Sequence, residues 1–249
     1  MRTKYSFYNL VINVVSSLLI PILGFVKVRL FISAYGSQIN GMQLTVMQYI
    51  VYLNIFELAY SLAFRQLMYK PLADENNERI KEIYYGAKKI FRLTGIILLI
   101  VGLVFSILIP YFTNTDISNS EITLSFIILF LPFALSYFLM GPNFLIAADQ
   151  KEFKINIWIQ TVAIIRMILM IVLILLGVSY IWIFLIDGVQ VFLANFIARK
   201  IALKHYPWLL DEVKYKDDKS FSKSIKYTLA NRFSSIANSN TDNIITDIR

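Results

Sequence analysis

Long apolar stretches separated by polar connections dominate the pattern of this chain. A helix needs about 20 mostly apolar residues to cross the hydrocarbon core of a bilayer. Six stretches are close to or above that length: 8–31, 40–63, 91–112, 122–146, 156–177 and 180–198. Backbone groups in lipid must be hydrogen-bonded within the protein, so each stretch is predicted to be a helix. The pattern therefore predicts an all-α integral membrane protein, a six-helix transmembrane bundle.

Proline interrupts two of these predicted spans. Pro21 lies in the first, three residues before Gly24, and Pro132 and Pro142 lie in the fourth. A proline inside a helix removes one backbone hydrogen bond and bends the helix. We therefore expect the first and fourth spans to be kinked.

A seventh element is predicted at the end of the sequence. Apolar residues recur there at helical spacing, and the opposite face is strongly polar. The apolar positions are Leu229, Phe233, Ile236 and Ile244. The sequence stops at Arg249, too early for this helix to cross a bilayer. Either the helix lies on the inner surface or the sequence is cut short. We therefore expect residues 1–224 to form one bundle and residues 225–249 to be the truncated start of a second.

Composition agrees with the membrane assignment and limits the chemistry. The chain is 57% hydrophobic and 16% charged, whereas soluble domains are about 45–50% apolar and about 25% charged. It has no cysteine and one histidine. A phosphate-binding loop motif, a zinc motif of the HExxH type and a Ser/His/Asp set in a plausible location are all absent from the sequence. We expect no enzymatic activity, no cofactor and no metal.

The basic residues indicate how the chain is oriented. Nineteen of the 24 Lys and Arg residues fall at the N-terminus and after the second, fourth and sixth predicted spans. The connections 33–39, 113–121 and 178–179 contain none. Basic loops stay in the cytoplasm, which predicts a multi-pass membrane protein with a cytoplasmic N-terminus. The net charge of +8 is thereby explained as a topology signal, and no nucleic-acid partner is expected.

Two ionisable residues lie deep in predicted spans. Arg166 is near the middle of the fifth span, and Asp187 lies at a comparable depth in the sixth, across a very short turn. Charged groups in a membrane are costly and mark candidate functional sites. The two residues are expected to pair, and the pair is either purely structural or lines a wet cavity.

Two more bases, Lys27 and Arg29, lie near the outer end of the first span. Residues two apart are about 200° apart on a helix, so both cannot face one lumen. At least one is expected to reach the outer headgroups with its charged end.

The second span carries a polar stripe that is unusual for a face exposed to lipid. Asn40, Gln43, Asn54, Glu57 and Ser61 fall within about 100° of arc on a helix. One interpretation is hydrogen bonding between helices. The other is that the stripe lines a polar cavity, in which Glu57 pairs with a base or binds a coupling cation.

The sequence also carries motifs that resemble a known family. Residues 35–80 contain a YG…NG pattern before the second span, the segment Phe56–Ala59, and LMYKPLA followed by a charged turn. Further matches are Asn143–Lys151, which ends in ADQK, and Asn240–Ile245. In order and spacing these motifs resemble the bacterial polysaccharide transporters, the oligosaccharide-unit (O-antigen and capsule) flippases of the multidrug/oligosaccharidyl-lipid/polysaccharide exporter superfamily.

The resemblance implies a fold of two six-helix bundles around a central cavity, of which this sequence is the first half. It also implies the function: moving undecaprenyl-diphosphate-linked oligosaccharide units from the inner to the outer leaflet for polysaccharide biosynthesis. The expected partners are the lipid-linked oligosaccharide, membrane lipids, a polysaccharide polymerase and glycosyltransferases. Alternating access by rocking of the two bundles is the default mechanism for such repeats.

Depth and charge sign suggest roles for individual residues. Bases bind a diphosphate by charge-assisted hydrogen bonds, which makes Arg166 and Lys27 or Arg29 candidates within the membrane. Arg65 is a candidate at the cytoplasmic mouth. Glu57 or Asp187 could carry ion coupling.

Two alternatives remain open. A multidrug exporter of the same superfamily would move cations and should have an acidic cavity, whereas the bases here favour an anionic substrate. An inactive membrane remnant or scaffold is the other alternative, since the sequence is expected to be truncated.

Overall fold

The computed structural model describes residues 2–53, 55–112 and 117–211, without the side chains of residues 2–6, 9, 53 and 55–59. The element predicted at 225–249 lies outside these ranges, so the expected boundary at residue 224 stays a prediction. Helices are the regular secondary structure of the described residues. They are α1 (Arg2–Tyr35), α2 (Ser37–Leu53), α3 (Ile55–Ala73), α4 (Asn77–Leu108), α5 (Asn119–Ser136), α6 (Pro142–Ala148), α7 (Phe153–Leu175) and α8 (Tyr180–His205), with short 3₁₀ helices η1 (Ile109–Phe112) and η2 (Pro207–Leu210).

Five helical segments of the described chain are long and apolar enough to cross a membrane. They are Leu10–Tyr35, Asn77–Phe112, Asn119–Ser136, Phe153–Leu175 and Tyr180–His205. The chain is therefore an all-α protein whose helices suit a membrane, as the apolar pattern predicts. The count of six spans is not confirmed.

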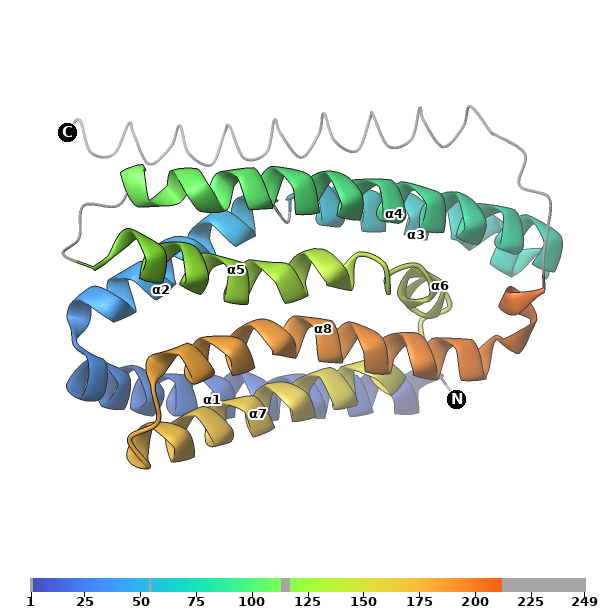
Figure 1. Ribbon diagram of the computed structural model, residues 1–249. Coiled ribbons are helices and arrows are strands. Elements are labelled where there is room, and N and C mark those ends of the chain that lie inside the picture. Colours follow the sequence, from blue (N-terminus) through green and yellow to red (C-terminus); the bar gives the residue numbers. More distant parts are fainter. Residues whose placement is uncertain (1, 54, 113–116, 212–249) are drawn as a thin grey trace, which may run out of the picture.

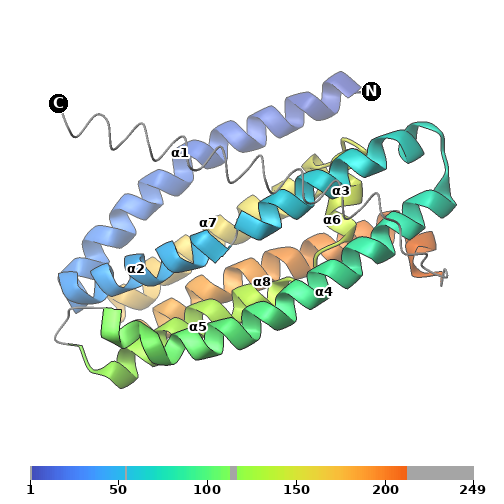
Figure 2. The same cartoon turned by 90° about the horizontal axis from the view of Figure 1, so that it is seen from above.

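The second predicted span, 40–63, lies in α2 and α3. Residue 54, between the two helices, lies outside the described residues, so a single span there stays a prediction. Figure 2 shows the two helices following one another in the same direction. Neither α2, with 17 residues, nor α3 is among the five segments that are long and apolar enough to cross a membrane.

The fourth predicted span, 122–146, is wrong as a single kinked helix. Helix α5 includes Pro132 but ends at Ser136, and α6 begins at Pro142 after a glycine with a φ of 132°. That φ is readily adopted only by glycine, and Pro142 fits the first turn of the new helix. Figure 1 shows α6 nearly end-on, crossing the direction of α5 and α8. Helix α1, by contrast, continues through Pro21 as one helix.

Aromatic packing holds the crossing helix α6 in place. The ring of Phe144 in α6 stacks on Phe91 of α4 with their centroids 5.0 Å apart. Phe91 also meets Tyr60 of α3 edge to face at 5.7 Å. Phe91 is fully buried, Phe144 is buried, and Tyr60 packs against them at the edge of the core, so burial of apolar area offsets the break in the backbone.

Helix α8 lies between α5 and α7 (Figure 1). Its approach to α5 depends on Gly188, where a Cβ would lie 2.7 Å from the backbone oxygen of Ile128. Small residues at helix interfaces allow such close backbone contact in membrane proteins. This contact fixes the position of Asp187, the neighbouring residue.

The basic segments gather at one end of the bundle. The N-terminus, the turn between α3 and α4, the start of α7 and the end of α8 share that end in Figure 1. The opposite end holds the α1–α2 junction, the end of η1 and the α7–α8 turn. The fold thus sorts the connections as the charge pattern does, and the cytoplasmic position of the basic end stays a prediction.

Candidate functional site

Four polar side chains from four helices meet inside the bundle. Lys27 of α1 donates through Nζ to Oε1 of Gln43 in α2 at 2.9 Å. Nε2 of Gln43 donates to Oδ2 of Asp187 in α8 at 2.7 Å. The other carboxylate oxygen of Asp187 accepts from Nη1 of Arg166 in α7 in a salt bridge. These four residues, which we call the polar network, connect α1, α2, α7 and α8.

Two tight helix junctions bring these residues to a common depth. Lys27 lies eight residues before the end of α1, and Gln43 lies six residues after the start of α2. Arg166 and Asp187 lie nine and seven residues from the α7–α8 turn. At 1.5 Å per residue, all four are about 9–14 Å from the same end of the bundle. Glycines with positive φ, Gly36 and Gly177, allow the two sharp turns.

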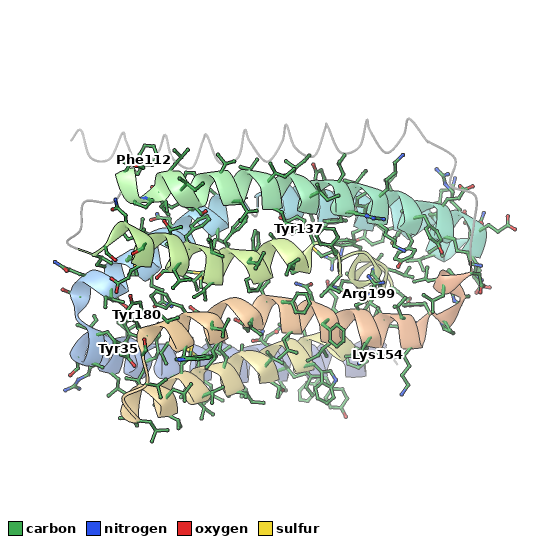
Figure 3. All side chains as sticks on the ribbon, in the orientation of Figure 1. Tyr35, Phe112, Tyr137, Lys154, Tyr180 and Arg199 are labelled. Atoms are coloured by element: carbon green, nitrogen blue, oxygen red, sulfur yellow. The ribbon has the colours of Figure 1, made fainter. Side chains whose placement is uncertain are left out.

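The two junctions are also tied to each other. The hydroxyl of Tyr35, at the end of α1, donates to the carbonyl oxygen of Val178 in the α7–α8 turn. The Tyr35 ring lies 6.2 Å from that of Tyr180, edge to face, and Figure 3 shows the two beside each other at this end of the bundle. These contacts between the two junctions therefore fix the position of α1 and α2 relative to α7 and α8.

The polar network is buried and carries an excess positive charge. Lys27, Gln43 and Asp187 are 8%, 3% and 6% exposed. In their ordinary charge states, two bases share one carboxylate, which leaves one positive charge in excess. In addition, Nε of Arg166 is buried and has no hydrogen-bond partner among the described residues. Buried charges are stabilised by pairing and hydrogen bonds, so the excess base and the unpartnered Nε are the unusual features of this site.

Arg166 also borders a groove on the surface between α7 and α8. The groove has a volume of about 350 Å³ and is lined mostly by Val, Ile and Leu side chains. Arg166 and Gln190 are the polar residues among those that line it. An opening between two spanning helices therefore leads from the lipid-facing surface toward one member of the polar network.

The other sequence-predicted residues are dispersed. Arg29 is exposed while Lys27 is buried, as expected for bases two residues apart on one helix. Asn40 in α2 is buried, at 9% exposure, and Ser61 in α3 is half-buried. Arg65 is far along α3 and forms a salt bridge with Glu152. Asn54 and the side chain of Glu57 lie outside the described residues.

A second polar cluster, at the basic end, was not predicted as a unit. Asp149 accepts hydrogen bonds from the Tyr206 hydroxyl and, at 2.5 Å, from Nζ of Lys151. Nζ of Lys154 lies 3.3 Å from Nδ1 of His205. Burial and the hydrogen bond to Asp149 raise the pKa of the Tyr206 phenol, so Tyr206 stays a neutral donor. Asp149 belongs to the ADQK motif, but its partner Tyr206 is 57 residues away in the sequence.

Two further contacts connect α8 to α6 and to the segment between α5 and α6. Nη1 of Arg199 donates to the carbonyl oxygen of Phe138 at 3.1 Å, and Figure 3 places Arg199 next to α6. Nδ2 of Asn143 donates to Oδ1 of Asn195 at 3.1 Å. Among the described residues, no group of three or more His, Cys, Asp or Glu could hold a metal ion. The two contacts with Arg199 and Asn195 hold α6 and the segment before it against α8.

Comparison of the chain with models of protein families, with curated proteins and with solved structures finds no match.

Proposed function

We propose that this chain acts in a transporter that flips undecaprenyl-diphosphate-linked oligosaccharide units from the inner to the outer leaflet of the bacterial plasma membrane. The observation that carries the proposal is the buried polar network, in which Asp187 pairs directly with Arg166 and is connected to Lys27 through the amide of Gln43. The motifs of the polysaccharide transporters in the sequence supply the substrate class.

The charge balance of the network favours an anionic substrate. An excess base at this depth is costly in a membrane unless an anion compensates it. A diphosphate has several acceptor oxygens, and guanidinium groups bind phosphate through charge-assisted, often bidentate hydrogen bonds. The free Nε of Arg166 is one donor available for such a ligand.

Asp187 gives this arrangement a means of release. Its carboxylate already occupies donors of Arg166 and Gln43, so it competes with a bound diphosphate for the same positive groups. Protonation of Asp187, or binding of a cation to it, would weaken that competition and strengthen substrate binding. This exchange makes Asp187 a candidate for ion coupling, a role for which Glu57 is the other candidate.

A flipping assay tests the proposal directly. The chain, with any further part of its gene product, is reconstituted in liposomes that contain a fluorescent polyprenyl-diphosphate sugar, and a membrane-impermeant quencher reports the leaflet of the label. We expect Arg166→Ala and Lys27→Ala to reduce the flipping rate strongly. Lys200→Ala is the matched control, because Lys200 is an exposed base on α8 outside the polar network.

The outcome of a charge swap separates binding from a structural role. If Arg166→Asp with Asp187→Arg restores flipping, the pair serves only to hold α7 against α8, and the substrate role of Arg166 is wrong. If the wild-type protein instead transports a cationic dye and leaves the lipid diphosphate in place, the multidrug exporter is the correct alternative. Transport of neither probe would favour a membrane scaffold.

A further inference from the structure

A second groove lies on the exposed surface of α4, near the basic end of the bundle. It has a volume of about 400 Å³ and is lined by Tyr85, Lys88, Lys89, Arg92, Leu93 and Ile96. These positions follow the i, i+3, i+4, i+7 spacing of a single helix face. The groove therefore presents a basic half followed, along the same helix, by an apolar half.

The position of the bases along α4 matches the membrane surface. The segment from Leu93 to Phe112 has 20 residues and no charged side chain. At 1.5 Å per residue it is about 30 Å long, which equals the thickness of the hydrocarbon core. Lys88 and Arg92 directly precede it, so they lie at the level of the lipid headgroups, and Leu93 and Ile96 lie at the level of the first acyl carbons.

Two carboxylates that lie near this groove in the described part of the chain have other basic partners. Glu82, one turn before the groove, binds Nη1 of Arg79 at 2.7 Å. The Asp211 carboxylate binds Nζ of Lys81 at 3.0 Å. Lys88 instead lies over the ring of Tyr85, with Nζ 5.6 Å from the ring centroid. Among the described residues, neither Lys88 nor Arg92 forms a salt bridge with an acidic side chain.

Tyr85 gives the groove a fixed side. Its hydroxyl lies 3.3 Å from the backbone oxygen of Asp211 and 3.4 Å from that of Leu209. Leu209 is buried in η2, so the ring cannot swing away from α4 without breaking these contacts. A ring held in this way positions the ammonium group of Lys88 above it.

We propose that this groove binds one anionic phospholipid, with the headgroup phosphate at Lys88 and Arg92 and an acyl chain along Leu93 and Ile96. Basic pockets at this depth bind anionic headgroups in membrane proteins, and the two apolar side chains are 58% and 41% exposed. A phospholipid fits both halves at once, whereas a soluble phosphate would use only the basic half. The inference needs only a membrane-embedded chain and does not depend on the proposed flippase activity.

Lipid retention in defined nanodiscs tests this site. The full chain is placed in nanodiscs of phosphatidylcholine with phosphatidylglycerol added, and native mass spectrometry measures which lipid remains bound after release. We expect the wild-type protein to retain phosphatidylglycerol. The double variant Lys88→Gln, Arg92→Gln should retain at least about tenfold less phosphatidylglycerol, since each base near the surface contributes to binding an anionic lipid.

The matched control is Lys200→Gln with Lys204→Gln, which removes the same charge from exposed positions near the same end, on α8. Retention close to that of the wild type is expected for this control. Equal losses in both double variants would mean that the attraction is diffuse, and the proposed site would be wrong. Unchanged retention in Lys88→Gln, Arg92→Gln would also overturn it. Thermal unfolding in detergent shows that each variant is folded.

Discussion

Gln43 and Asp187 are joined by a hydrogen bond of 2.7 Å, although they lie 144 residues apart in the sequence. The amide of Gln43 also accepts from Lys27, so one neutral side chain lies between a buried base and a buried acid. An amide can fill this role because it carries both a donor and an acceptor. Replacement of Gln43 should therefore disturb two charged groups at once.

The first prediction concerns this bridging amide. Gln43→Leu leaves the ammonium group of Lys27 and one oxygen of Asp187 without a partner in a buried site. Each unsatisfied polar group costs about 1–3 kcal/mol, so we expect a clearly lower midpoint of thermal unfolding in detergent. Gln48→Leu is the control, because Gln48 is on the same helix but exposed. Equal effects of both variants would mean that the bridge does not contribute to stability.

The second prediction concerns the ion pair of Arg166 and Asp187. Asp187→Leu leaves two buried bases without a carboxylate, and breaking a buried pair in this way costs about 3–5 kcal/mol. The double variant Arg166→Leu, Asp187→Leu removes one of those bases and should recover part of the lost stability. The free energies of unfolding of both variants, measured in the same detergent, decide the matter. A double variant as unstable as Asp187→Leu would contradict the prediction.

Part of this site could be predicted from the sequence because it depends on local geometry. The turn between α7 and α8 is short, so the depths of Arg166 and Asp187 follow from residue counts alone. The different surroundings of Lys27 and Arg29 follow from their angular separation on one helix. The grouping of basic connections at one end likewise follows from the alternation of apolar and charged segments.

The rest depends on packing between distant helices, which hydropathy does not report. Nothing in the stripe around Gln43 indicated that its partners would be Lys27 and Asp187. Apolar residues continue across the break between α5 and α6, so the hydropathy pattern predicts one kinked helix there, and it does not report the backbone φ of Gly141.

The third prediction concerns the close contact of α8 with α5. Gly188→Ala places a Cβ 2.7 Å from the backbone oxygen of Ile128, and a backbone atom cannot move aside as a flexible side chain can. Overpacking of this kind costs about 1–3 kcal/mol, which thermal unfolding would detect. Gly41→Ala is the control, since a Cβ at Gly41 meets nothing within 4 Å and alanine favours the helix by about 0.5–1 kcal/mol. If both variants unfold at the same temperature, the α5–α8 contact does not limit stability.

The last prediction concerns the Tyr206 phenol and its dependence on pH. The folded state raises the pKa of Tyr206 through burial and the hydrogen bond to Asp149, so the stabilisation is present at pH values below the pKa of an unfolded tyrosine, about 10. As the pH rises above that value, the unfolded state releases its proton and the folded state does not, which removes the stabilisation.

At neutral pH, Tyr206→Phe should therefore unfold at a lower temperature than the wild type, by the equivalent of about 1 kcal/mol. The difference between the two proteins should shrink when the pH is raised above about 10, because only the wild type loses this contribution. Tyr111→Phe serves as the control, since Tyr111 is 77% exposed, and its difference from the wild type should be small at every pH. A difference for Tyr206→Phe that stays constant or grows with pH would show that the hydrogen bond to Asp149 is not its cause.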